Sequence, residues 1–313
     1  MQTFIRAAEI WLPVQDQALL EFGAGLFGEA HGFAAASRAM RFARAQGLPG
    51  KAWDQGRPLL LNALEGAHFH RADEARQAGL TCAVALPFFV AGRLTSVLVL
   101  FGSDDQACTG AIELWRNDPR ISSDMTLVDG YYGGTEPAFE QLSRDTYLPR
   151  GMGLPGMAWQ REEAVIMGEL GASTRFLRGD VASDSGICRG LAMPCDTTGH
   201  ASYVLTLLSG DDTPIARRTE RWLLDTTLEC LKLAGGYCET QGPLDHVDKV
   251  MRLALLDPLV TEALRAGTPV LSEAAAQMAG PIGDAASSCG ATGCVWVPVM
   301  SEDKVSELVA LYL

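Results

Sequence analysis

The heptapeptide Gly47-Leu48-Pro49-Gly50-Lys51-Ala52-Trp53 recurs 106 positions later as Gly153-Leu154-Pro155-Gly156-Met157-Ala158-Trp159. Further matches accompany it on both sides: Glu9-Ile10-Trp11 with Glu113-Leu114-Trp115, Ser37-Arg38 with Ser143-Arg144, and Ala85-Leu86-Pro87 with Ala192-Met193-Pro194. The spacing of these matches exceeds the period of stacked solenoid repeats, so each copy is predicted to be a small domain with its own core.

A third, partial copy follows at an offset of 211, where Ala266–Leu271 matches Gln55–Leu60 and Val297-Pro298 matches Leu86-Pro87. Before it, residues 214–237 carry apolar residues at helical spacing and end at two glycines, which predicts a separating helix. We therefore expect three domains: residues 1–104, residues 105–240 with a C-terminal helix over 214–237, and a truncated third repeat over 241–313.

Each full copy is expected to contain two hairpin strands, a helix, a turn, a strand, a helix and a second, apolar hairpin. Short apolar runs closed by Gly, Asp or Pro indicate the strands, as in Ala8–Pro13 and Cys82–Val90. The Gly-Leu-Pro-Gly segment is predicted to be a turn that opens an extended segment. Strands joined by hairpins, with helices in the middle, predict an α+β fold with an antiparallel sheet flanked by helices.

The short linker Gly102–Gly110 leaves two interpretations open. In one, independent domains are joined by a tight connection. In the other, the strand ending at Phe101 continues into Ala111–Arg116, so that the repeats share an interlocked sheet, and strands from the N-terminus complete the third copy.

The composition of the chain indicates which classes of partner to exclude and where in the cell the protein is expected. A formal charge of −13 disfavours nucleic acid and anionic membranes, which need clustered Lys and Arg. No secretory signal pattern and no run of 18 apolar residues is found, so a cytoplasmic protein without membrane spans is expected. The eight cysteines form no C-x-x-C pair and are expected to be thiols.

The heptapeptide and the stretch Phe69-His70-Arg71-Ala72, which leads to Gly79-Leu80 and an apolar strand ending in Pro87, resemble the GAF family of small sensory domains. The resemblance implies tandem GAF-like (PAS-like) domains, each an antiparallel sheet flanked by helices. The Asn-Lys-x-Asp signature of cyclic-nucleotide-binding members is absent, and no cysteine precedes a histidine as in bilin-attaching members. No cofactor is indicated, and no output domain is visible.

The candidate ligand-binding residues lie at equivalent places in the two full copies. Tryptophan offers apolar area with one polar group, and arginine binds anions through paired hydrogen bonds. Both residue types have a structural alternative, since such a tryptophan can fill the core and such an arginine can lie on a solvated helix face. His68 and His70 alternate on one side of a strand but lack further ligands for a metal. The six candidates are Trp53, Phe69, Arg71, Trp159, Phe176 and Arg178.

These observations favour a non-enzymatic regulatory or sensory protein that binds a small molecule or a protein partner. No catalytic set of residues stands out. One alternative is a thiol-dependent enzyme resembling the free methionine-R-sulfoxide reductases of the GAF-like group, for which Cys188 with Cys195 or Cys289 with Cys294 would have to act as a pair. Another is an assembly module, a homodimer in which the helix 214–237 pairs with its symmetry mate.

Overall fold

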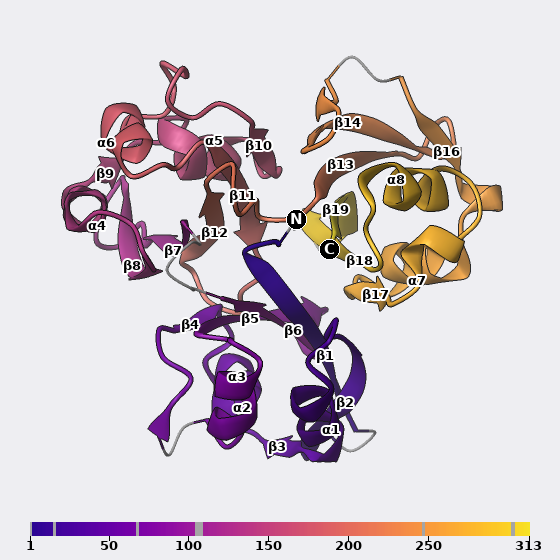
Figure 1. The fold of residues 1–313 in the computed structure, drawn as a ribbon. Helices are drawn as coiled ribbons and strands as arrows, with labels where there is room; N and C mark the ends of the chain where they lie inside the picture. Colours follow the sequence, from indigo (N-terminus) through magenta and orange to yellow (C-terminus); the bar gives the residue numbers. More distant parts are fainter. Residues whose placement is uncertain (1, 15–16, 67–68, 104–108, 246–247, 302–303) are drawn as a thin grey trace.

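The computed structural model describes residues 2–14, 17–66, 69–103, 109–245, 248–301 and 304–313. Within these residues the chain forms three antiparallel β-sheets, each covered by helices on its outer side, around a common centre (Figure 1). We call them unit 1 (residues 5–102), unit 2 (residues 110–209) and unit 3 (residues 218–312). The two chain termini lie close together near that centre (Figure 1).

The elements follow one another in nearly the same order in each unit. Unit 1 contains β1 (Ile5–Pro13), β2 (Leu19–Leu26), α1 (His31–Ala39), β3 (Arg41–Ala43), α2 (Gly47–Gln55), β4 (Leu59–Leu61), α3 (Ala72–Gln77), β5 (Cys82–Val90) and β6 (Arg93–Gly102). Unit 2 contains β7 (Gly110–Asn117), β8 (Met125–Tyr131), α4 (Pro137–Asp145), β9 (Tyr147–Leu148), α5 (Gly153–Arg161), β10 (Val165–Met167), α6 (Gly179–Asp184), β11 (Arg189–Cys195) and β12 (Ser202–Ser209). Unit 3 contains β13 (Arg218–Asp225), β14 (Cys230–Cys238), β15 (Gly242–Pro243), β16 (Val250–Arg252), the 3-10 turn η2 (Leu253–Leu255), α7 (Pro258–Ala266), β17 (Val270–Ser272), the 3-10 turn η3 (Ala275–Gln277), α8 (Pro281–Cys289), β18 (Cys294–Ser301) and β19 (Lys304–Tyr312).

The three sheets have equivalent strand orders: β3-β2-β1-β6-β5-β4, β9-β8-β7-β12-β11-β10 and β15-β14-β13-β19-β18-β17. The predicted opening and closing hairpins of units 1 and 2, and the closing hairpin of unit 3, are confirmed by this pairing. In unit 3, β15, β16 and η2 stand between the second strand and the next helix, where the other units carry α1 and α4. The expected antiparallel α+β architecture is therefore present.

A buried Glu-x-Trp segment fixes the same register in the first strand of every unit. Glu9 pairs with Gly25, Glu113 with Gly130 and Glu220 with Gly236, and in each case a β-bulge falls between the middle residue and the tryptophan. A bulge places two residues opposite one and bends the strand. The same bulge at the same position shows that all three opening hairpins are built alike.

The predicted helix over 214–237 is wrong, because this stretch forms most of the hairpin β13–β14. In a strand that is buried on both faces, apolar residues need not alternate with polar ones, so the same apolar residues also fit two strands. The third unit is therefore not a truncated repeat that begins near residue 241. It opens with β13, and Glu220-Arg221-Trp222 stands 211 positions after Glu9-Ile10-Trp11, the offset already seen in its second half.

The Gly-Leu-Pro-Gly segment was also predicted incorrectly, since it forms the first turn of α2 and of α5 rather than a turn before a strand. Proline is tolerated in a first helical turn, where the N–H groups have no intrahelical acceptor. A Cβ on Gly50 would lie 2.2 Å from the Ala43 carbonyl oxygen. The second glycine thus lets the helix approach the preceding strand.

The interlocked-sheet interpretation is not supported, because β6 and β7 belong to different sheets. Strands β13 and β14, and not the N-terminal strands, supply the opening hairpin of unit 3. Residues 104–108 of the intervening linker lie outside the described part of the chain.

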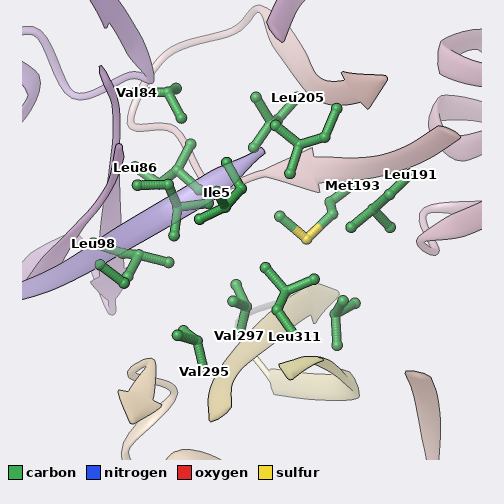
Figure 2. Close-up of a cluster of buried hydrophobic side chains, with 14 of the residues drawn as sticks. Ile5, Val84, Leu86, Leu98, Leu191, Met193, Leu205, Val295, Val297 and Leu311 are labelled. Atoms are coloured by element: carbon green, nitrogen blue, oxygen red, sulfur yellow. The ribbon is translucent and has the colours of Figure 1, made fainter. Parts of the chain in front are cut away.

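The units are joined by a central apolar core, because the sheet faces opposite the helices all point inward (Figure 2). Unit 1 contributes Leu86 and Leu98, unit 2 Met193 and Leu205, and unit 3 Val297, among others. Each buried side chain of this size stabilises the fold by about 1.5–3 kcal/mol relative to exposure. Every sheet is therefore buried on both faces, with its own helix-side core and a shared inner core.

Contacts at the sheet edges also pass from each unit to the next and close on themselves. The short strand β4 of unit 1 lies against β8 of unit 2, β10 of unit 2 against β14 of unit 3, and β17 of unit 3 against β2 of unit 1. Each pair joins equivalent strands. The chain is thus organised with approximate three-fold symmetry, in which unit 3 meets unit 1 as each of the others meets its successor.

Within the described residues, no helix combines the length and the apolar composition needed to cross a lipid bilayer.

Replacing Gly236 by alanine is expected to destabilise the protein by about 1–3 kcal/mol. The added Cβ would lie 2.3 Å from the backbone oxygen of Thr219, so β13 would have to move. Urea unfolding measures the loss. Gly32→Ala is the control, because nothing lies within 4 Å of its Cβ position, and its stability should be unchanged or higher. Equal stabilities for the two variants would contradict the register argument.

Candidate functional site

The candidates Arg71 and Arg178 are buried and paired with glutamates of their own units. Arg71 binds both carboxylate oxygens of Glu9, one of them at 3.2 Å, and also donates to Ser37. Arg178 binds Glu113 in the same manner, with one N···O distance of 2.9 Å. These guanidinium groups neutralise internal carboxylates, a function that neither sequence alternative included.

Aromatic rings enclose both arginines. The guanidinium carbon of Arg71 lies 5.3 Å from the ring centre of Phe69, and that of Arg178 lies 5.1 Å from the ring centre of Phe176. The structure thus brings together four of the six candidates, two in each unit. The cavity beside Phe69 and Arg71 is only about 10 Å³. Such a volume holds about one water molecule, so protein side chains fill the predicted ligand position.

Unit 3 also neutralises a buried glutamate, but it uses different residues. Glu220 accepts hydrogen bonds from Arg218 at 2.6 Å, Trp222 at 2.9 Å and Tyr312 at 3.1 Å. The position equivalent to Arg71 is occupied by Ile282, which cannot neutralise a carboxylate. Arg218, on the same strand as Glu220, does so instead. In all three units, then, a buried glutamate accepts from the tryptophan two residues later and from an arginine.

The pKa of Glu113 reflects this environment. Burial acts to raise it, but the charge of Arg178 and hydrogen bonds from Arg178, Trp115 and Tyr132 outweigh burial and hold it below the ordinary 4.5. Because the folded-state pKa is lower than the unfolded-state pKa, the resulting stability is complete above the ordinary value. It is lost as the pH falls through the folded-state value.

We expect Glu113→Gln to cost about 3 kcal/mol or more at pH 7, because Arg178 would be left buried without its counter-charge. The difference from the unmodified protein should shrink below pH 4.5, and urea unfolding at several pH values tests this. Glu140→Gln, in the exposed pair with Arg144, should cost less than about 1 kcal/mol. A penalty for Glu113→Gln that does not vary with pH would refute the assignment.

The remaining candidates, Trp53 and Trp159, stand outside the buried arginine clusters. Each lies under an arginine of its own unit, Trp53 under Arg44 at 5.8 Å and Trp159 under Arg150 at 5.3 Å. Trp53 borders a recess of about 290 Å³ at the boundary with unit 2. Trp159, only partly buried, lines a larger cavity, which we call the axial pocket.

The axial pocket has a volume of about 310 Å³ and lies where equivalent strands of the three units converge. Ligand sites typically measure roughly 300–1,000 Å³, so this pocket has the size of a site for a small molecule. Its apolar floor comes from three equivalent segments of β5, β11 and β18: Leu86-Pro87-Phe88, Met193-Pro194-Cys195 and Val297-Pro298-Val299.

The three floor prolines occupy one position of the repeat. Strands β5, β11 and β18 each pair with a short edge strand, and the last paired residues are Ala85 with Leu59, Ala192 with Val165 and Trp296 with Val270. Each proline stands two residues after that last pair. A proline beyond the edge strand costs no pairing with it. The sequence matches included these prolines, but no pattern in the sequence indicated that they would face one another.

Unlike the floor, the rim of the pocket is polar and comes mostly from unit 2. Arg150 and Glu162 form an ion pair at 3.8 Å, while Asp196 accepts a hydrogen bond from the backbone N–H of Phe89 at 2.7 Å. Tyr203 and His200 also line the pocket. Sequence analysis missed all of these rim residues, because most of them lie in or beside loops, where no chemical pattern marked them.

Pocket symmetry is broken at one buried position. The residue that follows each floor proline pairs with a residue of the neighbouring strand. That partner is Ser96 in unit 1, Tyr203 in unit 2 and Glu307 in unit 3. Glu307 accepts from Ala164 and from Arg221, so it joins unit 3 to unit 2. Of the three equivalent residues, Tyr203 alone is part of the pocket wall.

The four cysteines named for the reductase alternative do not resemble reactive thiols. Burial raises the pKa of Cys188 to about 12, assisted by a hydrogen bond with Asp211, and burial raises the pKa of Cys195 to about 12. The pKa values of Cys289 and Cys294 are also raised by burial. A nucleophilic thiol needs the opposite shift. Cys108 lies outside the described residues.

In the part of the chain that the structure describes, no three His, Cys, Asp or Glu side chains are grouped to hold a metal ion. His68, one of the two alternating histidines, lies outside that part.

No protein-family model and no curated protein matches this sequence. Solved structures do match, each over about a third of the chain. These neighbours are GAF domains and GAF-like proteins.

Three examples illustrate the similarity. The free methionine-R-sulfoxide reductase of Neisseria meningitidis, solved with its substrate, has 19% identity and a TM-score of 0.25, over 34% of this chain and 53% of its own. The GAF domain of A. aeolicus nlh2 has 17% identity and a TM-score of 0.26, over 32% and 59%. A GAF domain/HD domain protein of Geobacter sulfurreducens has 15% identity and a TM-score of 0.27, over 34% and 66%. The match thus spans little more than half of the first two neighbours.

Proposed function

We propose that this chain is a non-enzymatic regulatory protein of three GAF-like units that binds a small molecule in the axial pocket. The observation that carries the proposal is the position of this pocket, where segments of all three units form one floor. A molecule bound there contacts every unit at once. Its binding would therefore strengthen the contacts among the units, and a protein partner that recognises the tightened form would receive the signal.

Two features of the pocket fit ligand binding. The floor is apolar while the rim carries charged and hydrogen-bonding groups, the usual division between affinity and orientation in small-molecule sites. Trp159, a candidate from the sequence, forms part of the wall. The cavity that Phe69 and Arg71 line themselves offers no comparable space, and the proposal therefore concerns the centre of the molecule rather than those buried clusters.

The assembly alternative has lost the element on which it depended. A homodimer was expected from pairing of a helix over 214–237, and this stretch forms β13 and β14 within the sheet of unit 3.

Occupancy of the axial pocket can be tested by screening metabolites for an increase in the melting temperature. At a hundredfold excess over the dissociation constant, a ligand stabilises the folded protein by about 2.7 kcal/mol. Ala201 lines the pocket, and Ala201→Phe should abolish the increase by filling it. Ala35→Phe on the exposed side of α1 should leave it intact. A screen without hits, or hits that Ala201→Phe retains, would refute the proposal.

The reductase alternative predicts fast thiol chemistry, whereas the raised pKa values predict slow chemistry. In a Cys108→Ser background, we expect a disulfide reagent at pH 7 to label Cys188 and Cys195 far more slowly in the folded protein than in urea. Mass spectrometry of timed samples identifies each labelled cysteine. If either thiol in the folded protein reacted as fast as free glutathione, the reductase alternative would be favoured instead.

A further inference from the structure

Two aromatic rings of the axial pocket already face cationic side chains. The guanidinium of Arg150 lies 5.3 Å from the ring centre of Trp159, and that of Arg57 lies 5.9 Å from the ring centre of Tyr203. A cation within about 6 Å of a ring face is attracted by the negative charge of the π system. Both rings are therefore oriented so that cations can reach their faces.

Arg150 is held loosely in this position. Its ion pair with Glu162 measures 3.8 Å, close to the limit of about 4 Å for such a pair, and both side chains are more than half exposed at 54% and 61%. Exposed pairs of this kind contribute little to stability. Arg150 thus resembles an internal substitute for a ligand cation, placed between an aromatic ring and a carboxylate and easily displaced.

The charge around the pocket favours the same sign of ligand. Among the described lining residues, the carboxylates of Glu162 and Asp196 outnumber the guanidinium of Arg150, while Arg57 faces Tyr203 from outside the lining. The whole chain has a formal charge of −13, which attracts cations and repels anions. Beneath the charged rim, Pro87, Pro194 and Pro298 provide an apolar floor with no charge to neutralise.

We propose that the axial pocket binds an organic cation with an apolar body, an alkyl- or arylammonium compound, whose charged group displaces Arg150 from the face of Trp159. The apolar body then covers the proline floor. This inference rests on the proposed function and specifies the chemical class of its ligand. An anion would meet the two carboxylates, and a neutral molecule would lack the cation–π attraction to the ring faces.

Isothermal titration calorimetry with three probes tests the class of ligand: benzyltrimethylammonium as the cation, phenylacetate as the anion and benzyl alcohol as the neutral compound. Only the cation should bind saturably. Trp159→Leu should weaken its binding at least about threefold, the loss expected from a single cation–π contact. Glu162→Gln should weaken it in the same direction.

The most specific variant is Arg150→Ala, which should tighten binding of the cation about threefold or more by removing the internal competitor. Arg150 is exposed, so this variant is expected to fold even if Trp159→Leu does not. The matched controls are Arg44→Ala and Trp53→Leu, which alter the equivalent pair in unit 1 and should leave cation binding unchanged.

Two results would overturn this inference while leaving the proposed function intact. One is binding of phenylacetate that Arg150→Ala abolishes, and the other is a set of metabolite hits, sensitive to Ala201→Phe, that contains no cation. If the metabolite screen gives no hit sensitive to Ala201→Phe, the proposed function fails, and this inference fails with it.

Discussion

The structure depends on the burial of both faces of every sheet. In each unit one face packs against helices, and the other packs against the sheets of the two remaining units in the central core. A strand buried on both sides has no solvent-facing positions, which explains why β5 and β6 read as nearly continuous apolar runs without the alternation of a half-exposed strand. No single unit could hide its inner face alone.

Buried glutamates at the start of each unit are the polar counterpart of this core. The first strand carries a carboxylate into the protein interior, where an ionised group is costly unless it is paired and hydrogen-bonded. Units 1 and 2 neutralise it with an arginine from the segment before α3 or α6, whereas unit 3 uses Arg218 on the strand itself. All three units therefore pair the buried carboxylate with an arginine, but the position of that arginine in the sequence differs in unit 3. Such clusters do not imply ligand binding, although the arginine and phenylalanine in them had suggested it.

The sequence predicted the strand hairpins, the α+β class and the presence of repeats, because local apolar patterns and turn residues determine these features. It also contained the opening hairpin of unit 3. Glu220, Trp222 and Gly236 stand 211 positions after Glu9, Trp11 and Gly25, respectively. The apolar residues among them also fitted a helix, because the spacing of apolar residues alone cannot separate a helix from a buried strand in short segments. The axial pocket could not be predicted in this way. It arises from the packing of strands more than a hundred residues apart, and most of its rim residues lie in or beside loops, where no chemical pattern marked them.

A site on the axis of a true homotrimer presents three identical walls, so a ligand without that symmetry meets three equal orientations and can fix none of them. In this chain the three copies are covalently linked, and each has been free to diverge. Ser96, Tyr203 and Glu307 now occupy one structural position, and at that position only unit 2 places an aromatic ring in the wall. Fusion into one polypeptide therefore allows the centre of the molecule to hold an asymmetric guest in a single pose.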